Sequence, residues 1–202
     1  IRTRIEFVLR RKEKLVICVT STESGDGKTF LSTNLASLYA MTGKKVLLID
    51  FDLRKPNVHT KLGLENGSGI SNYLIGDCEL KDILVKDTPF GFDFMRAGTI
   101  PPNPGELVHT DKVAEMMVDL RQKYDFIIMD TSPIGLVPDA YALIEQSDMC
   151  LFVIRCMQTN KSFCKQTLEQ MAEVIDSPEK AQLILSDIPT TGRHSYGSGY
   201  GY

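Results

Sequence analysis

A loop of small residues between an apolar run and a helical pattern has the composition of a phosphate-binding loop. Gly25 and Gly27 can place backbone N–H groups around phosphate oxygens, because glycine adopts conformations that other residues avoid. Lys28 can neutralise the outer phosphates, and the Thr29 hydroxyl can ligate magnesium at a helix N-terminus. The pattern G-x-x-x-x-G-K-[ST] is met except at its first position, where Thr22 replaces glycine. We interpret the loop as a nucleotide site rather than a purely structural corner, with these binding residues: Ser24, Gly25, Asp26, Gly27, Lys28, Thr29 and Phe30.

Three aspartates follow apolar runs elsewhere in the chain. Asp50 and Asp52 lie two residues apart in an extended segment, so both side chains point to the same side. Asp130 ends a second apolar run, a position suited to a carboxylate that holds magnesium directly or through water. One such aspartate could simply cap a helix or form a turn. Together with the phosphate loop, the three predict a Mg-nucleotide site.

The elements that position these residues follow from the hydrophobic pattern. Most of the apolar runs are nearly continuous, which is typical of strands covered on both faces. Strands are predicted at 15–20, 45–50, 92–96, 125–130, 149–154 and 182–186. Helices are predicted at 3–13, 28–41, 110–123, 137–147 and 160–176. This alternation favours an α/β fold with a doubly wound, mostly parallel sheet between two helical layers, in which ligands bind beyond the carboxyl ends of the strands.

The segment 52–110 is less periodic and richer in Gly and Pro. Short helices are predicted there at 56–62, 69–74 and 79–85, and a loop at 100–106. Asp139, just before a helical pattern, is expected to cap that helix. The polar, Gly-, Ser- and Tyr-rich end of the chain has little to bury. We therefore expect one folded nucleotide-binding domain over 1–192 and a flexible tail over 193–202.

Composition narrows the class of protein. The 202 residues carry a net charge of −3, which provides no overall basic surface for nucleic acid. The five cysteines follow no metal-binding or disulfide pattern, and Cys18 and Cys150 lie in apolar runs, which favours a reducing compartment. No apolar run approaches the ~18 residues of a membrane span. The chain is expected to be cytoplasmic.

The strings TSTESGDGKTF, VLLIDFDLRKP and FIIMDTSP resemble the Walker A, A′ and B motifs of the bacterial tyrosine kinases, or BY-kinases. The resemblance covers essentially the whole chain, including a C-terminal tyrosine cluster. It implies a P-loop kinase that uses ATP and Mg²⁺, phosphorylates its own tail and regulates capsule or exopolysaccharide polymerisation and export. Two positions depart from the family pattern, because Ser24 replaces a common proline and Ser186 replaces an asparagine near the base.

The resemblance also implies roles for individual residues. Lys28 and Thr29 would bind phosphates and Mg²⁺, and Asp130 would complete the metal shell. Asp50 and Asp52 would serve metal binding and activation of the attacking hydroxyl. We assign the metal to Asp50 and the proton to Asp52, although the two roles could be exchanged. Catalytic residues are thus Lys28, Asp50, Asp52 and Asp130, and metal ligands are Thr29, Asp50 and Asp130.

The predicted phosphoacceptors are Tyr196, Tyr200 and Tyr202. A phenol has a pKa of about 10, so it attacks poorly at neutral pH until a carboxylate accepts its proton. The flanking Gly and Ser residues would let the tail enter a neighbouring protomer. Arg2 matches the last arginine of the family's ring-assembly helix, which implies a ring-like homo-oligomer. The family also implies a transmembrane activator, a cognate tyrosine phosphatase and attachment to the inner face of the membrane through an upstream region or a partner.

Two other functions share the same loop and acids. The first is a switch ATPase of the septum-placement or plasmid-partition type, with water as the acceptor. Those proteins usually carry a second lysine where Glu23 or Ser24 stands here. The second is a nucleotide-binding scaffold without catalysis. The D-F-D-L-R string and the tyrosine tail favour the kinase.

Overall fold

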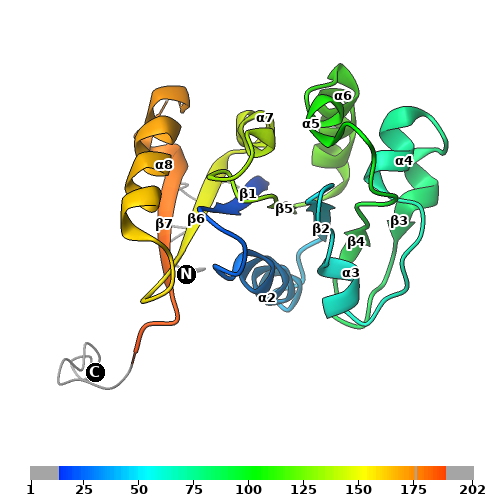
Figure 1. Cartoon of the computed structure of the whole chain (residues 1–202). Helices are drawn as coiled ribbons and strands as arrows, with labels where there is room; N and C mark the ends of the chain where they lie inside the picture. The colour runs from blue at the N-terminus through cyan, green and yellow to red at the C-terminus, as the bar shows by residue number, and fades with distance from the viewer. Residues whose placement is uncertain (1–13, 176, 190–202) are drawn as a thin grey trace, which may run out of the picture.

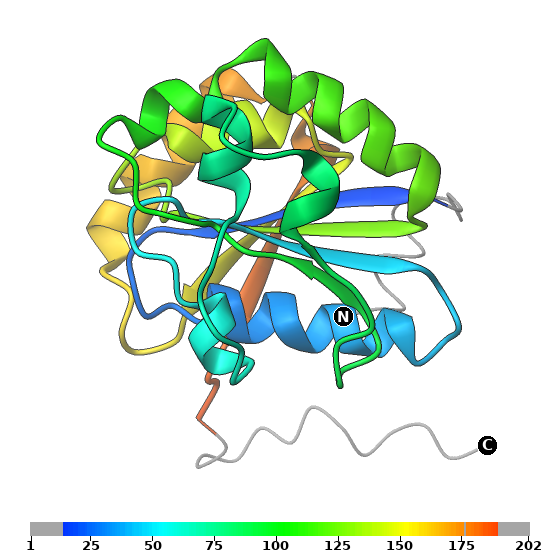
Figure 2. The same ribbon diagram turned by 90° about the vertical axis from the view of Figure 1, so that its right-hand side faces the viewer.

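The protein forms an α/β fold around one twisted sheet (Figures 1 and 2). The computed structural model describes residues 14–175 and 177–189. Its seven-stranded sheet has the order β3-β4-β2-β5-β1-β6-β7. The strands are β1 (Leu15–Ser21), β2 (Val46–Phe51), β3 (Leu84–Val85), β4 (Asp93–Met95), β5 (Phe126–Thr131), β6 (Met149–Arg155) and β7 (Ala181–Ser186). All neighbours are parallel except β3, which pairs antiparallel with β4. The predicted doubly wound, mostly parallel sheet is confirmed.

Helices cover both faces of the sheet, as Figure 1 shows. One face carries α2 and α3, and the other carries α4 to α8. The helices are α2 (Lys28–Ala40), α3 (Val58–Lys61), α4 (Ile70–Ile75), α5 (Pro104–Val108), α6 (Asp111–Lys123), α7 (Asp139–Glu145) and α8 (Lys161–Val174), with 3-10 helices η1 (Leu80–Ile83) and η2 (Pro178–Lys180). No helix within the described ranges is both long and apolar enough to cross a bilayer.

Alternate side chains of the central strands pack into two separate hydrophobic cores, one on each face of the sheet. In β1, Ile17 and Val19 pack on the α2 side, while Val16 and Cys18 pack on the opposite side. All seven residues of β1 are buried, which explains the continuous apolar run in the sequence. Cys18 and Cys150 are buried free thiols at paired positions of β1 and β6, as predicted for core residues.

The helix predicted at 110–123 packs as its pattern requires. Its apolar stripe, Val113, Met116, Met117 and Leu120, is buried in the core on the α4–α8 side. On the other face, α2 packs through small and apolar residues, and the Tyr39 ring stacks on Phe126 with centroids 3.7 Å apart. These contacts fix α2 against the centre of the sheet, and thus fix the loop that precedes it.

The segment 52–110 differs from its prediction in three places. The expected loop at 100–106 contains the start of α5, with Pro104 in the first turn, where its fixed φ suits a helix. The helix expected at 79–85 is a 3-10 turn that leads into the two-residue strand β3. The helix expected at 56–62 is shortened to Val58–Lys61. Elements this short carry too few residues to show a period.

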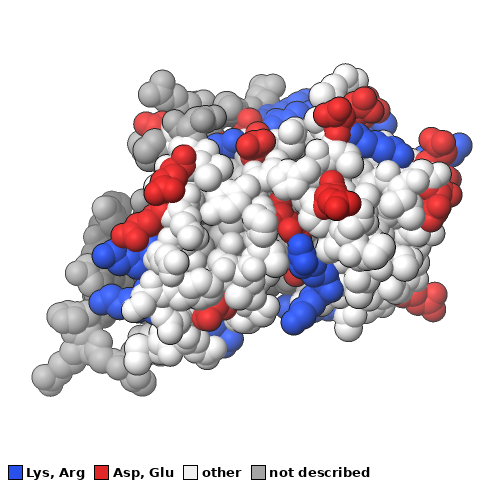
Figure 3. Space-filling view, turned by 45° about the horizontal axis from the view of Figure 1, so that its top comes forward, with Lys and Arg blue, Asp and Glu red and all other residues white. Residues whose placement is uncertain are grey.

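Several predictions fall outside the described residues. These are the helix at 3–13, Arg2, and the tail with Tyr196, Tyr200 and Tyr202. Figure 3 shows that the charged side chains on the face it views include both signs, with wide uncharged areas between them. Figure 2 shows the turn between β1 and α2 at one end of the sheet, where the parallel strands end.

Candidate nucleotide and phosphoryl-transfer site

Two aspartates lie side by side at the carboxyl ends of neighbouring strands. Asp50 of β2 and Asp130 of β5 occupy paired positions in the parallel register. Asp50 is fully buried and Asp130 is 2% exposed. The side chains therefore meet below the phosphate loop rather than in solvent.

Asp130 is bound to the first turns of α2 by two hydroxyl groups. The Thr29 hydroxyl donates to Asp130 Oδ2 at 2.6 Å, and the Ser32 hydroxyl donates to Asp130 Oδ1 at 2.9 Å. Thr29 Oγ1 also lies 3.2 Å from Asn57 Oδ1. These contacts place the two predicted metal ligands, Thr29 and Asp130, in direct contact with each other. Ser32 and Asn57 were not predicted, because nothing in a lone Ser or Asn marks such a contact in sequence.

Burial and neighbouring carboxylates disfavour the charged forms of both Asp50 and Asp130. Burial raises the pKa of Asp50 well above its usual range, and the neighbouring Asp130 and Asp52 raise it further. The N–H groups of Val58 and Asp52 oppose the rise by donating to Asp50 at 3.1 and 3.2 Å. Burial also raises the pKa of Asp130, against the hydroxyl of Thr29 and the charge of Lys28. Such a pair of carboxylates favours a cation beside it.

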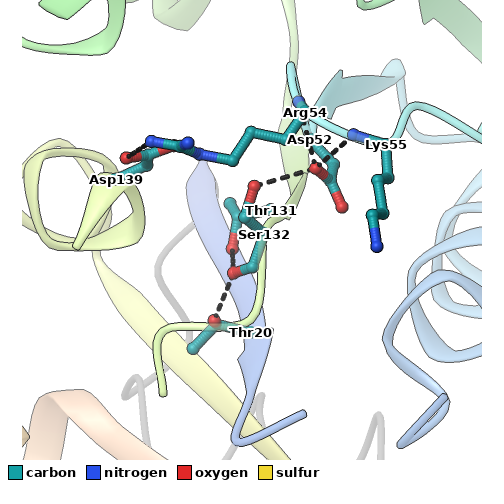
Figure 4. Close-up of polar contacts among 7 residues, drawn as sticks. All are labelled: Thr20, Asp52, Arg54, Lys55, Thr131, Ser132 and Asp139. Carbon is teal, nitrogen blue, oxygen red and sulfur yellow. Dashed lines mark hydrogen bonds and ion pairs between the residues drawn. The ribbon is translucent and has the colours of Figure 1, made fainter. Parts of the chain in front are cut away.

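Asp52 is held at one oxygen and left open at the other. Its Oδ1 accepts the Ser132 hydroxyl at 2.8 Å and the N–H groups of Lys55 and Arg54 at 3.0 and 3.3 Å (Figure 4). Ser132 is fixed in turn, because the Thr20 hydroxyl donates to its carbonyl at 2.9 Å. Within the described residues, Asp52 Oδ2 accepts no side-chain or turn hydrogen bond. The orientation leaves this oxygen available as a proton acceptor.

Arg54 and Asp139 form a bidentate ion pair beside this site (Figure 4). Arg54 Nε donates to Asp139 Oδ2 at 2.7 Å, and Nη2 donates to Oδ1 at 3.0 Å. The prediction that Asp139 caps a helix is wrong. Helix α7 begins at Asp139 itself with Pro138 in the cap position, and the Asp139 carboxylate is taken by Arg54 instead. The pair ties the residues after Asp52 to the start of α7.

The phosphate loop has the backbone that anion binding requires. Gly25 and Gly27 have φ values of 93° and 103°, in the left-handed region that favours glycine. Gly27 is the N-cap residue of α2, and no side chain caps its first N–H groups. Free N–H groups at a helix N-terminus form a ready anion site. Ser24 is exposed on the loop, and Phe30 is 70% exposed on α2.

Lys28 lies at the centre of the site rather than in solvent. It is only 8% exposed. Burial lowers the pKa of Lys28, while the charges of Asp130, Asp52 and Asp26 oppose that effect. Two of the carboxylates whose charges act on the ammonium group, Asp52 and Asp130, are predicted catalytic acids. An ammonium with little water around it interacts strongly with an anionic phosphate.

Residues from the C-terminal half of the chain form hydrogen bonds to the outer side of the phosphate loop. Asp26 is buried, and its carboxylate accepts the Thr159 hydroxyl at 2.7 Å and the Glu23 N–H at 2.9 Å. Arg155 Nη1 donates to the Gly25 carbonyl at 3.1 Å. The Ser186 hydroxyl donates to the Asp26 carbonyl at 3.1 Å. Ser186, expected near the base, therefore contacts the phosphate loop itself.

The donors fit a magnesium ion that shares its shell with phosphate and water. Carboxylates and a hydroxyl, from Asp50, Asp130 and Thr29, are oxygen ligands that Mg²⁺ accepts. Within 14–175 and 177–189, no group of three or more His, Cys, Asp or Glu side chains is arranged to hold a metal alone. Mg²⁺ usually takes only one or two carboxylates and completes its shell with water and substrate phosphates. The site matches that second description.

A hollow opens next to Asp52. Its volume is about 760 Å³, and Arg54 and Lys55, whose N–H groups hold Asp52, form part of its wall. Other lining residues are Pro56, Asn57, His59, Asn66, Gly98, Thr99 and Ile100. The Asn57 side chain also contacts Thr29. The hollow therefore connects the phosphate side of the site to solvent on the Asp52 side.

A doubly wound sheet with a phosphate loop and acids at two adjacent strand ends defines a P-loop nucleotide-binding domain. The family model described as "AAA domain" matches residues 14–185. YwqD of Bacillus subtilis, a tyrosine-protein kinase, is 36% identical over 202 residues that cover 100% of this chain and 83% of YwqD. Etk of Escherichia coli, also a tyrosine-protein kinase, is 35% identical over 173 residues. The chain belongs to the AAA-domain family and, within it, to the bacterial tyrosine-protein kinases.

Solved structures agree with this placement. The kinase domain of E. coli ETK superposes with a TM-score of 0.87 at 29% identity, covering 100% of this chain and 78% of that chain. MinD of Pyrococcus horikoshii, solved with Mg-ADP, superposes with a TM-score of 0.67 at 23% identity, a likeness of fold alone. The chain spans 27% of EpsB from Ralstonia solanacearum, to which it is 31% identical, and 24% of E. coli Etk.

Proposed function

We propose that this chain is the catalytic domain of a Mg-ATP-dependent protein-tyrosine kinase that phosphorylates Tyr196, Tyr200 and Tyr202 in the tail of a neighbouring copy. The observation that carries the proposal is the position of Asp52. Its carboxylate lies close enough to Lys28 for their charges to interact, and its anchored backbone borders the hollow where an acceptor would enter. A site for hydrolysis alone would not need a carboxylate beside a space of this size.

The residues divide the work as follows. Gly25, Gly27 and Lys28 bind and orient the phosphates of ATP through backbone N–H groups and one ammonium. Thr29, Asp50 and Asp130 would hold Mg²⁺, which supplies charge neutralisation to the phosphates when bound.

Asp52 Oδ2 accepts the proton of the tyrosine hydroxyl. The phenolic oxygen forms a bond to the γ-phosphorus while the bond between that phosphorus and the β,γ-bridging oxygen breaks, so ADP leaves with the electron pair. Lys28 stabilises the negative charge on the transferring group. The roles of Asp50 and Asp52 follow their surroundings, because Asp50 is fully buried while Asp52 is only half-buried and directly precedes the residues that form the wall of the hollow.

The assembly and partners are part of the same proposal. Transfer between copies fits a ring-like homo-oligomer in which Arg2 takes part. A transmembrane activator, whether fused upstream or separate, would bring the domain to the inner face of the membrane, and a tyrosine phosphatase would reverse the reaction. The output would be control of capsule or exopolysaccharide polymerisation and export.

Incubation with Mg-ATP followed by phosphopeptide mapping tests the function. We expect phosphate on the three tail tyrosines and none with Asp52→Asn. A Lys28→Met chain with an intact tail should be phosphorylated only when an active partner is added. Mixing that inactive chain with an active chain whose three tail tyrosines are Phe isolates transfer in trans. Phosphate on Ser or Thr alone would contradict the proposal.

A switch ATPase is the second candidate, because the MinD fold is shared. Deletion of 194–202 separates the two functions. Undiminished ATP turnover by the truncated chain, stimulated by a protein partner and without phosphotyrosine in the intact chain, would favour the ATPase. Glu23 and Ser24 argue against it, since neither supplies the second lysine of those proteins. Asp52→Asn also tests the scaffold alternative. If the chain only binds ATP, the level of phosphotyrosine should be the same in the wild type and in the Asp52→Asn variant.

A further inference from the structure

Five lysines line one hollow at the end of the sheet opposite to the phosphate loop. The hollow has a volume of about 660 Å³. Its walls come from the α2–β2 loop, η1, the β3–β4 turn and the end of α6, and its lysines are Lys44, Lys45, Lys81, Lys86 and Lys123. We call this surface the lysine groove. Figure 2 shows the α2–β2 loop and the last turn of α6 together at one end of the molecule, with the β1–α2 turn at the other.

The described part of the chain does not neutralise the positive charge of the lysine groove. All five lysines are exposed, and none of them forms an ion pair with another described residue. Two carboxylates line the groove, Asp87 and Asp93. Asp93 already accepts the Tyr124 hydroxyl at 2.7 Å and the Asp87 N–H at 3.0 Å. Both oxygens of Asp93 therefore already accept a hydrogen bond, while none of the five lysine ammonium groups donates to a described residue.

The type of cation in the groove distinguishes between anionic partners. Pockets that recognise a single phosphate group, as in phosphopeptide binding, use the planar, bidentate guanidinium of arginine. The cations that line this groove are all lysines. Lysine carries a compact charge on a flexible stem, which suits attraction to a diffuse anionic surface. The carboxylates of Asp87 and Asp93 in the lining also disfavour a phosphate enclosed by the groove.

Exposed apolar side chains flank the lysines on the same loops. Met41, at the start of the loop that carries Lys44, is 82% exposed. Phe90, in the turn that carries Lys86, is 41% exposed. Basic residues beside exposed apolar ones are typical of surfaces that bind the interface of a membrane.

We propose that the lysine groove, with Met41 and Phe90, binds the surface of an anionic lipid bilayer directly. In this orientation the amino ends of the strands face the bilayer and the phosphate loop faces away from it, accessible to ATP and to the tail of another copy. The proposal concerns a surface that takes no part in phosphoryl transfer, so it does not rest on the proposed function.

Vesicle co-sedimentation of the full chain tests the proposal. Vesicles of phosphatidylcholine alone are compared with vesicles that also contain phosphatidylglycerol, over a range of salt concentrations. The groove variant combines Lys44→Gln, Lys45→Gln and Lys86→Gln. The matched control combines Lys161→Gln, Lys165→Gln and Lys180→Gln, which removes the same charge from two exposed positions and one half-buried position elsewhere. Both variants keep all the basic residues before Lys14, so those residues contribute equally.

We expect binding only to the anionic vesicles and weakening as salt rises. The groove variant should bind about one hundredfold more weakly than wild type, from about 1 kcal/mol per lysine near an anionic surface, and the control should bind much as wild type does. Met41→Ser should also weaken binding. Equal Mg-ADP binding and equal thermal midpoints confirm that both variants are folded.

Two results would overturn the proposal. One is a groove variant that binds anionic vesicles as tightly as the control does. The other is an equal loss of vesicle binding in both variants, which would show that binding depends on net charge and not on the position of the lysines. A synthetic 193–202 peptide phosphorylated on its three tyrosines is assayed in parallel. If the groove variant loses the peptide and keeps the vesicles, the surface binds a phosphopeptide and the lipid assignment is wrong.

Discussion

The Ser132 hydroxyl donates a 2.8 Å hydrogen bond to Asp52 Oδ1, across 80 residues of sequence. Ser132 is 2% exposed, and the Thr20 hydroxyl bonds its carbonyl. The result is a carboxylate with one fixed oxygen, Oδ1, and one oxygen, Oδ2, that accepts no side-chain or turn hydrogen bond from the described residues. Because a misplaced base lowers the rate more than it lowers binding, this contact should matter to turnover and little to ATP affinity.

Ser132→Ala should therefore lower the turnover number of tail phosphorylation about tenfold and leave the KM for ATP nearly unchanged. Ser132→Thr, which keeps the hydroxyl, should recover most of the rate. Initial-rate kinetics with a quantified phosphotyrosine product measure both. Ser147→Ala is the matched control, since Ser147 is a buried serine that donates to the Ile144 carbonyl after α7, at the opposite end of the sheet from the phosphate loop. Equal losses in the Ser132 and Ser147 variants would contradict the positioning role.

Asp50 should destabilise the magnesium-free protein. Because burial and Asp130 raise the pKa of Asp50, the folded chain takes up a proton at a higher pH than the unfolded chain does. The ionised group therefore weakens the folded state above its raised pKa, and this effect disappears as the pH falls through that value. Asp50→Asn should raise the free energy of unfolding by about 1 kcal/mol at about pH 8 and by less at about pH 5.

Urea denaturation in EDTA at both pH values measures this effect. Asp77→Asn, at an exposed position, serves as the control and should change stability little. With Mg-ADP added, the order should reverse, because the wild-type chain keeps its metal ligand. An Asp50→Asn chain that is less stable than wild type in EDTA at both pH values would contradict the prediction.

Lys28→Met should reduce phosphoryl transfer by at least about a hundredfold, the size typical of removing one preorganised charge from a transition state. Lys28 is buried, and its charge interacts with those of Asp130, Asp52 and Asp26, so the substitution also removes a cation that compensates these acids. Radiolabel transfer measures the rate, and circular dichroism checks the fold. Lys61→Met is the control, because Lys61 is an exposed lysine on α3. Retention of more than a small fraction of the rate would exclude Lys28 from the chemistry.

The Arg54–Asp139 pair should contribute more than a surface ion pair. Asp139 is 5% exposed at its side chain while Arg54 is 39% exposed, so water screens only one partner. A double-mutant cycle with Arg54→Ala and Asp139→Ala should give a coupling energy of about 1 kcal/mol. The exposed Lys165–Glu169 pair on α8 is the matched comparison and should give about 0.3–0.5 kcal/mol. A coupling no larger than that of the α8 pair would show that the bidentate geometry adds nothing.

Local chemistry made part of this protein predictable. Gly25, Gly27 and Lys28 are adjacent in the chain, and the left-handed φ of the two glycines is a property of the residue type. Buried strands such as β1 have continuous apolar runs because helices cover both their faces. Asp50 and Asp130 each end such a strand, so their meeting at one edge followed from a parallel sheet.

Only the tertiary structure decided the contacts between distant segments. The order β2-β5-β1-β6 brings Ser132 to Asp52, Asp139 to Arg54, and Arg155 to the Gly25 carbonyl. The partner of a single Ser or Arg cannot be predicted from the local sequence, because these hydrogen bonds depend on which strands are neighbours in the sheet. The five-residue α5 and two-residue β3 escaped prediction for a related reason: tertiary packing, not periodicity, stabilises elements that short.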